Sequence, residues 1–335
     1  MEKLAVDSDP NRLLQTANCP LPTPRCKLPA ANCKLSLRGY NVRLPDHGMI
    51  MSQKVLSQID ADGNATVMLN RPELHNAFDR EMVDVFTAAL RKLEANPKVR
   101  AIVVTGAGKS FCAGADIEHM KRSARFSREQ NLENARATAM MLHTLYTLEK
   151  PTIACVRGAA RGGGVGLVAA CDIAIAERGA TFRLSEVKLG IIPAMISPYV
   201  VAAMGRHHAH RYMLSGEEFD SAEAFRIGLV HDICEEPELN ALVGRMLAHL
   251  YSSGPNAVVA IKKMIPEVAG SRINDALLEM TAQRIAEIRT TPEAQEGLSA
   301  FLEKRRASWV TPASEKSKSK KESNRQDARK SKDRN

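Results

Sequence analysis

One stretch, residues 152–197, decides how this chain folds: TIACVRGAARGGGVGLVAACDIAIAERGATFRLSEVKLGIIPAMIS. Its pattern predicts a buried strand over 152–156, three glycines at 162–164, a helix that begins on them, and a second strand over 172–176. Glu186 follows in an ordered turn. Glycines ahead of a helix let bare backbone amides approach a ligand, and the helix N-terminus adds the positive end of its dipole. The stretch therefore suits a ligand that develops negative charge.

Two glycine motifs imitate nucleotide-binding loops. The run from Gly164 to Ala169 matches the dinucleotide pattern GxGxxA, but the expected strand ends at residue 156, several residues before the first glycine. The run at 106–110, GAGKS, imitates a phosphate-binding loop, but that motif requires glycine where Val103 stands. Both patterns therefore disfavour a nucleotide-binding function.

Composition and charge limit the class of protein. The chain has 335 residues, of which 44% are hydrophobic, and this is ample for a large core. It contains no run of eighteen apolar residues, so no membrane-spanning helix is expected. Of the net charge of +9, residues 1–50 carry +3 and residues 311–335 carry +5, which leaves +1 for the body at 51–310. A body with so little excess charge is not an electrostatic binder of nucleic acid.

The seven cysteines form no CxxC pair, and no secretory signal precedes them. An odd, scattered set of this kind is typical of reduced thiols, so we predict a cytoplasmic protein. Because the cysteines lack the spacing of a zinc site, we predict no bound metal.

The two ends of the chain differ from the body between them. Residues 1–50 hold six of the sixteen prolines and show no apolar period, which predicts a disordered N-terminal extension. Residues 311–335 are a low-complexity run of lysine, serine, arginine and aspartate, which predicts a disordered basic tail. An alternative start at Met51 would remove the first segment.

Strands and helices alternate through the first part of the body. The pattern predicts strands over 55–60, 65–70 and 99–104, and a helix that Asp79 caps and that runs to about residue 96. Strand, helix and strand in this order indicate an α/β fold with helical crossovers.

The second part of the body is mostly helical. A polar loop is expected over 121–128, followed by a helix over 129–149. Beyond the central stretch, Asp220 caps a further helix. Other predicted helices cover residues 198–204, 207–214, 239–252, 256–265, 274–288 and 293–307.

Several short motifs together resemble those of the enoyl-CoA hydratase/isomerase (crotonase) family. They are Asn70-Arg71-Pro72-Glu73 with Asn76-Ala77, Phe111-Cys112-Ala113-Gly114-Ala115-Asp116, Gly162-Gly163-Gly164, Cys171-Asp172, Glu186, Leu189-Gly190, Pro193 and Gly228-Leu229-Val230. The resemblance covers about residues 51–310. It implies an α/β fold with a ββα spiral core at 51–255, a helical C-terminal subdomain at 256–310, and homotrimers that often pair into hexamers. It also implies an acyl-CoA substrate and no separate cofactor.

The resemblance assigns roles to residues of the site. It implies that the backbone amides of Ala115 and Gly163 donate hydrogen bonds to the thioester oxygen, where such donors stabilise enolate charge. Glu186 matches one of two glutamates of the related hydratases, whereas Gly166 stands at the position of the other. The implied substrate-binding residues are His75, Ala77, Ala113, Asp116, Ile117, Gly162, Arg161 and Pro193.

One branch of the family resembles the chain at this departure. Residues 162–172, with Ile192-Pro193-Ala194 and residues 196–200, look like bacterial methylglutaconyl-CoA and isohexenylglutaconyl-CoA hydratases of leucine and acyclic-terpene catabolism. The likeness implies hydration of a branched, 3-methylglutaconyl-type thioester. Its distal carboxylate would need a cation, for which the candidates are Arg161, Arg183 and Lys188. A role of Arg161 at the surface or on a CoA phosphate is equally compatible.

Other functions stay open at this point. An isomerase would use Glu186 to move a proton without adding water, and the glycine at 166 also permits a catalytically inactive scaffold. RNA binding through the basic tail is a further alternative, although a solvated tail is the simpler interpretation. The cluster His207, His208 and His210 favours a surface or CoA-proximal role over a metal site.

Overall fold

The computed structural model describes residues 54–310. The extension predicted over 1–50 and the basic tail predicted over 311–335 lie outside this range. Within it, no helix combines the length and apolar character needed to cross a bilayer.

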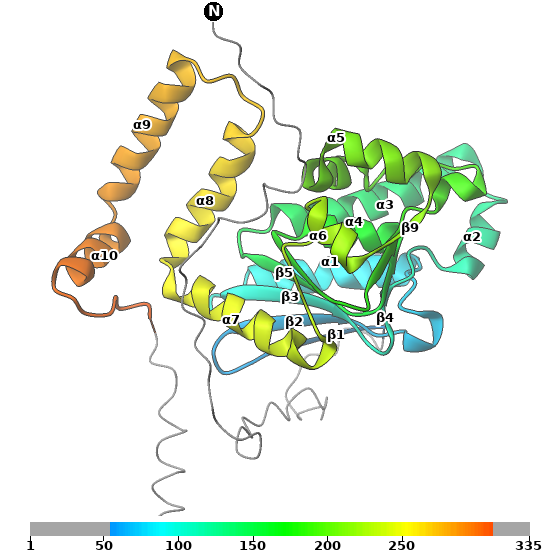
Figure 1. Ribbon diagram of the computed structural model, residues 1–335, viewed down its shortest axis with the longest axis horizontal. Helices are drawn as coiled ribbons and strands as arrows, with labels where there is room; N and C mark the ends of the chain where they lie inside the picture. The colour runs from blue at the N-terminus through cyan, green and yellow to red at the C-terminus, as the bar shows by residue number, and fades with distance from the viewer. Residues whose placement is uncertain (1–53, 311–335) are drawn as a thin grey trace, which may run out of the picture. The chain divides into compact units, whose positions relative to one another are not determined.

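A six-stranded sheet forms the centre of the fold (Figure 1). Its strands lie in the order β1-β2-β3-β5-β7-β10, and only β1 and β2 pair antiparallel. Parallel strands covered by helices are buried on both faces, as the unbroken apolar runs of β3 and β5 predict. The strands are β1 (Val55–Ile59), β2 (Asn64–Leu69), β3 (Ala101–Gly106), β5 (Thr152–Val156), β7 (Ile173–Glu177) and β10 (Asp232–Cys234).

A second sheet of four short strands lies in the order β4-β6-β8-β9. The chain enters it directly after β3, β5 and β7, so each turn of the chain adds one strand to each sheet. The sequence pattern predicts none of these strands, because three residues are too few to show a period. They are β4 (Ser110–Cys112), β6 (Ala159–Arg161), β8 (Thr181–Arg183) and β9 (Glu218–Asp220).

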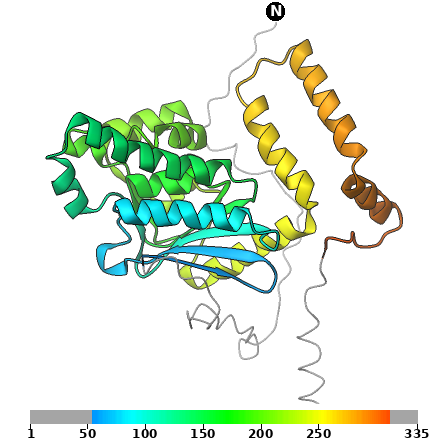
Figure 2. The ribbon, with the colours of Figure 1, turned by 180° about the vertical axis from the view of Figure 1, so that it is seen from behind.

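Helices α1 (Arg80–Glu94) and α3 (Arg128–Thr147) pack side by side over one face of the large sheet (Figure 2). The predicted cap of α1 is confirmed, since the Asp79 side chain accepts a hydrogen bond from the amide of Met82. The loop predicted over 121–128 is partly wrong, because α2 (Ile117–Ser123) begins at an Asp116 cap and continues through Ser123.

The opposite face of the sheet is covered by α7 (Leu239–Ser252). Alternate strand residues divide between the faces: Ile102 and Val104 join the main core, whereas Ala101 and Val103 pack with Leu239 of α7. Both sides of the sheet are therefore sealed from water, which leaves its strand ends and loops to carry function.

The remaining helices follow the predicted order. The helix α5 (Ser197–Ser215) is kinked at Gly205, where the sequence separates two predicted helices. The predicted Asp220 cap of α6 (Ser221–Arg226) is confirmed by a hydrogen bond from the amide of Glu223. The chain continues through α8 (Pro255–Val268), α9 (Asp275–Arg289) and α10 (Pro292–Leu302), and the last of these ends five residues before the predicted limit of 307.

Candidate active site

The glycine cluster begins helix α4 (Gly163–Ala170) and leaves no room for side chains. Gly162, the N-cap residue, has φ 47°, a conformation that residues with a Cβ rarely adopt. A Cβ on Gly163 would lie 2.3 Å from the Phe78 ring, and one on Gly164 would lie 2.4 Å from the carbonyl oxygen of Cys112. These contacts explain why three glycines occur in succession.

A second turn, residues 112–116, lies against this cluster. Gly114 has φ 84°, and its carbonyl oxygen accepts a hydrogen bond from the Phe78 amide at 2.8 Å. A Cβ on Gly114 would lie 2.8 Å from the carbonyl oxygen of Arg161 and 3.4 Å from the amide nitrogen of Gly163. Two turns that are about fifty residues apart in the chain therefore meet backbone to backbone.

The two amides that the sequence singles out are both available to a ligand. Within residues 54–310, neither the Ala115 amide nor the Gly163 amide donates a hydrogen bond to another protein group. Ala115 is also exposed. Because unpaired backbone N–H groups seek an acceptor, the adjoining turns can bind an oxygen that carries negative charge.

Glu186 lies at the glycine cluster, at the start of the 3-10 helix η2 (Glu186–Leu189). A Cβ on Gly162 would lie only 2.8 Å from its Oε1 atom. Its Oε2 atom is buried and has no hydrogen-bond partner in the described part of the chain. Burial raises the pKa of this carboxyl, and a hydrogen bond from its own backbone amide offsets the effect only in part. A buried carboxyl without a cation beside it is a typical proton-transfer group.

An apolar side chain occupies the space beside Gly166, the residue that the resemblance aligns with a second glutamate. Gly166 is buried, and a Cβ there would lie 2.2 Å from Cγ2 and 2.8 Å from Cβ of Ile196, which is only 3% exposed. The glycine on α4 therefore packs directly against an isoleucine just before α5. A carboxylate cannot enter this space unless Ile196 moves.

Asn76 ties the loop after β2 to the segment 107–110, which leads into the second turn, and the sequence pattern did not predict this role. It is fully buried with φ 59°, and its side-chain oxygen accepts a hydrogen bond from the Arg71 amide at 2.9 Å. Its side-chain nitrogen donates to the carbonyl oxygens of Ala107 and Ser110, at 2.8 and 2.7 Å. Asparagine tolerates the left-handed conformation better than most residues, and this is the local signal that could have identified it.

The other predicted substrate-binding residues differ in exposure. His75 is exposed, and its Nδ1 lies 3.0 Å from the Ser110 hydroxyl. Ile117 is exposed at the start of α2, and Pro193 is half-buried between η2 and α5. The half-buried Ala113 donates its amide hydrogen to the carbonyl oxygen of His75.

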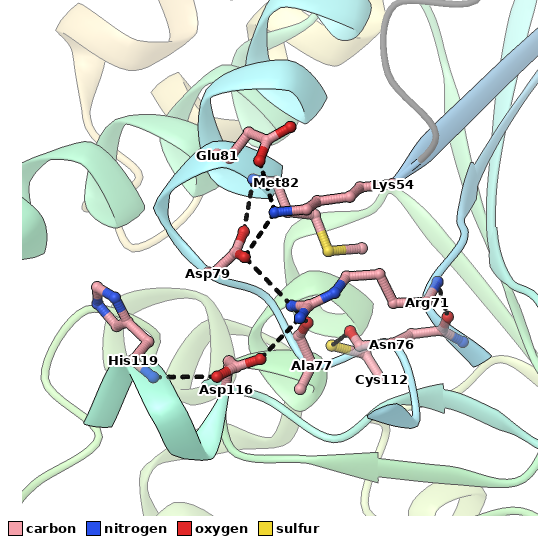
Figure 3. Close-up of polar contacts among 10 residues, drawn as sticks. All are labelled: Lys54, Arg71, Asn76, Ala77, Asp79, Glu81, Met82, Cys112, Asp116 and His119. Carbon is pink, nitrogen blue, oxygen red and sulfur yellow. Dashed lines mark hydrogen bonds and ion pairs between the residues drawn. The ribbon is translucent and has the colours of Figure 1, made fainter. Parts of the chain in front are cut away.

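Two of the predicted substrate-binding residues serve the protein itself in this structure. Asp116 is 5% exposed, and its carboxylate caps α2 and binds Arg71 (Figure 3). Ala77 is buried, and its carbonyl oxygen accepts a hydrogen bond from Arg71. Side chains or carbonyls engaged in this way are less available to a substrate.

Arg161, the predicted cation for a distal carboxylate, lies on the small sheet. Its Nη2 atom contacts the Glu218 carboxylate at 2.6 Å and the Thr181 hydroxyl at 3.0 Å. Its Nη1 atom is buried without a partner among the described residues. Of the other two candidates, Arg183 donates to the carbonyl oxygen of Gly216, and Lys188 is exposed.

The histidines at 207, 208 and 210 line a surface hollow together with other residues of α5 and one residue of α6. Neither amide turn nor Glu186 contributes to this hollow. Its lining consists of His207, His208, His210, Arg211, Leu214, Ser215 and Arg226. Residues 54–310 contain no group of histidine, cysteine, aspartate or glutamate side chains that could hold a metal ion.

The fold and the site together define an α/β enzyme in which two amide turns and one carboxylate converge. The family model for enoyl-CoA hydratase/isomerase matches residues 61–312, so the chain belongs to this family. It is an enzyme of the enoyl-CoA hydratase type with the crotonase fold, two mixed sheets and C-terminal helices. Membership of the family implies an acyl-CoA substrate.

Known proteins resemble the chain over most of their length. A crystal structure of an enoyl-CoA hydratase from Shewanella pealeana has a TM-score of 0.74 at 40% identity and covers 76% of this chain and 96% of its own. The structure of Pseudomonas aeruginosa AtuE has a TM-score of 0.73 at 35% identity and covers 77% and 100%. The crotonyl-CoA hydratase of Syntrophomonas wolfei is 32% identical over 250 residues, which are 74% of this chain and 94% of that protein.

Proposed function

We propose that this enzyme adds water to a branched α,β-unsaturated acyl-CoA of the 3-methylglutaconyl type, in the breakdown of leucine or of terpenoid acyl chains. The observation that carries the proposal is the buried, unpartnered Oε2 of Glu186 beside the glycine cluster. The sequence supports the substrate class, because the residues around Gly166 resemble the methylglutaconyl-CoA and isohexenylglutaconyl-CoA hydratases.

In this proposal the amides of Ala115 and Gly163 hold the thioester carbonyl oxygen. Attack at the β carbon moves the π electrons toward that oxygen, so its negative charge grows as the reaction proceeds. Donors already aimed at the oxygen lower the barrier, since they need no reorganisation when the charge appears. The N-terminus of α4, which begins at Gly163, adds a favourable dipole.

Glu186 acts as both base and acid. Its carboxylate removes a proton from water while the water oxygen bonds to the β carbon, and an enolate forms on the thioester. The enolate then collapses, and its α carbon takes a proton from the Glu186 carboxyl, or from a second water whose hydroxide then takes the proton held by Glu186. One water is added overall and the carboxylate is restored. A pKa raised by burial brings the group closer to working pH, where proton transfer is most efficient.

Arg161 binds the distal carboxylate of the substrate in this proposal. The support is its Nη1 atom, which is buried and unpaired within the described residues. A guanidinium that already holds Glu218 through Nη2 keeps a fixed orientation, and its unsatisfied Nη1 atom would gain a partner from a substrate carboxylate that displaced the groups covering it.

We also propose a homotrimer, or a hexamer of two trimers, assembled through the C-terminal helices. The support is apolar exposure in this region, where Ile273, Phe301 and Leu302 are 85%, 80% and 78% exposed. Side chains of this size favour burial against a partner. Sedimentation of the full chain tests this, and a monomer at micromolar concentration would contradict it.

The test compares the full-length enzyme with Glu186→Gln, Arg161→Gln and the control Glu287→Gln, an exposed glutamate on α9. Loss of enoyl-thioester absorbance is followed with 3-methylglutaconyl-CoA and with crotonyl-CoA, and the masses of the products are measured by mass spectrometry. Glu186→Gln should lower kcat by about 10²- to 10⁴-fold. Arg161→Gln should weaken the preference for the branched acid, and Glu287→Gln should change neither.

Two outcomes would contradict the proposal. If Glu186→Gln retains full turnover, another group is the acid/base. If the product mass shows no added water while the double bond moves, the enzyme is an isomerase that uses the same carboxylate.

A further inference from the structure

The guanidinium of Arg71 joins residues 77–79 to Asp116, the last residue of the Ala115 turn (Figure 3). Its Nη2 atom donates to the Asp116 carboxylate at 2.9 Å, and its Nη1 atom lies 3.5 Å from the Asp79 carboxylate. Nη1 also donates to the carbonyl oxygen of Ala77 at 2.7 Å. With the Arg71 side chain only 12% exposed, these contacts are largely shielded from water.

Both aspartates are helix caps, and each divides its two oxygens between a helix and Arg71. Oδ1 of Asp79 accepts from the Met82 amide at the start of α1, whereas Oδ2 faces Arg71 and Lys54. Oδ1 of Asp116 accepts from the His119 amide at the start of α2, whereas Oδ2 binds Arg71. One guanidinium therefore couples the N-termini of two helices.

The pKa of Asp116 is consistent with a permanent charge at this cap. Burial alone would raise it, but the hydrogen bonds from the His119 amide and from Arg71 hold it below the ordinary value. The carboxylate thus stays ionised, and its pairing with Arg71 persists through the pH range in which an enzyme of this kind works.

Ala115, whose amide is one of the proposed oxyanion donors, lies next to one of these caps and is bridged to the residue before the other. Ala115 precedes Asp116, and Phe78 precedes Asp79. Phe78 and Ala115 form a parallel bridge, in which Phe78 donates to the Gly114 carbonyl oxygen and accepts from the Asp116 amide at 3.1 Å. A shift of either cap would rotate the Ala115 peptide, because the bridge and the caps share the same backbone.

We infer that Arg71 is a positioning residue, which aims the Ala115 amide at the thioester oxygen by holding the two caps together. The inference rests on the proposed function, in which that amide is an oxyanion donor. Arg71 itself does not touch the substrate. A lysine cannot replace it fully, since a single ammonium lacks the forked geometry that reaches both carboxylates and a carbonyl oxygen.

The experiment measures kcat, KM and melting temperature of the full-length wild type, Arg71→Lys, Arg71→Gln and Asp116→Asn. The matched control is Arg80→Gln, which removes an exposed guanidinium paired with Asp84 on α1. A second readout uses bound acetoacetyl-CoA, whose enolate absorbs in the near ultraviolet, so the band reports directly on the oxyanion donors.

The expected result is a fall in kcat of about 10-fold for Arg71→Lys and about 100-fold for Arg71→Gln, with KM nearly unchanged and a weaker enolate band. Asp116→Asn keeps the cap oxygen and should behave like Arg71→Lys. If Arg71→Gln does not fold, Arg71→Lys and Asp116→Asn decide.

Variants that melt earlier but keep the wild-type kcat and enolate band would overturn the inference, since Arg71 would then serve stability alone. A wild type that shows no enolate band would overturn the oxyanion assignment itself, and the inference with it. The hydration assay with Glu186→Gln distinguishes this second failure from a failure of the proposed reaction.

Discussion

The two turns that offer amides to the site are held in different ways. The Ala115 turn is held by polar groups, since Asp116 ties it to the Arg71 guanidinium and the Ala113 amide donates to the carbonyl oxygen of His75. The Gly163 turn is held by packing, because Phe78 and Cys112 lie where its glycines would have side chains. A backbone donor can thus be held in place by charges and hydrogen bonds, or by packing so close that even a Cβ atom does not fit. Different substitutions should disrupt the two kinds of support.

Gly163→Ala should have the largest effect, because it attacks the packed turn directly. The new Cβ would lie 2.3 Å from the Phe78 ring, so the ring or the amide must move. We expect kcat to fall by about 100-fold or more, as for the loss of one oxyanion donor. Gly244→Ala, in open space within α7, is the control and should retain activity and gain about 0.5–1 kcal/mol of stability. Full activity of Gly163→Ala would show that this amide is not a donor.

Asn76→Ala should loosen the segments that lead into the Ala115 turn and cost mainly stability. It removes a hydrogen bond from each of the carbonyl oxygens of Ala107 and Ser110 and from the amide of Arg71, and alanine is strained at φ 59°. We expect the free energy of unfolding to fall by about 3 kcal/mol, measured by urea denaturation. The control Asn131→Ala, on the exposed face of α3, should change it by less than about 0.5 kcal/mol. Equal stability of the two variants would contradict the role given to Asn76.

Gly166→Ala tests packing at the position of the missing glutamate. The clash with Ile196 should cost about 1–3 kcal/mol of unfolding free energy. Ile196→Ala removes Cγ2, the nearer of the two obstructing atoms, and leaves Cβ, so the double variant should be more stable than the sum of the single changes predicts, by about 1 kcal/mol. Simple additivity in urea denaturation would mean that the two side chains do not compete for the same space.

The ionisation of Glu186, whose carboxyl lies at the glycine cluster, should appear in the pH profile of kcat/KM. In the proposed mechanism Glu186 is a base when ionised, and burial raises its pKa above the ordinary 4.5. Activity should therefore be lost as the pH falls through a midpoint above 4.5, and it should be fully present well above that value. In Glu186→Gln the residual rate should lack this limb. A wild-type midpoint at or below 4.5 would show that a group other than the buried carboxyl is titrating.

Local patterns predicted the elements that are local in origin. The strands β3 and β5 are short, β-branched and buried on both faces, and the caps at Asp79 and Asp220 depend on residues three positions apart. The small sheet was not predictable in this way, since each strand such as β6 exists only through its neighbours. The helical turn that ends at Ser123 was missed because its cap, Asp116, looks like part of a glycine loop.

The sequence by itself determined the family, the three glycines of the cluster and the glycine at position 166, because each is written in short motifs of neighbouring residues. Only the tertiary structure decided that Ile196 packs against Gly166, that Oε2 of Glu186 lies buried without a partner among the described residues, and that Arg71 spans two helix caps. The physical reason is distance along the chain: Arg71 and Asp116 are 45 residues apart, and their contact depends on how the sheets and helices pack between them.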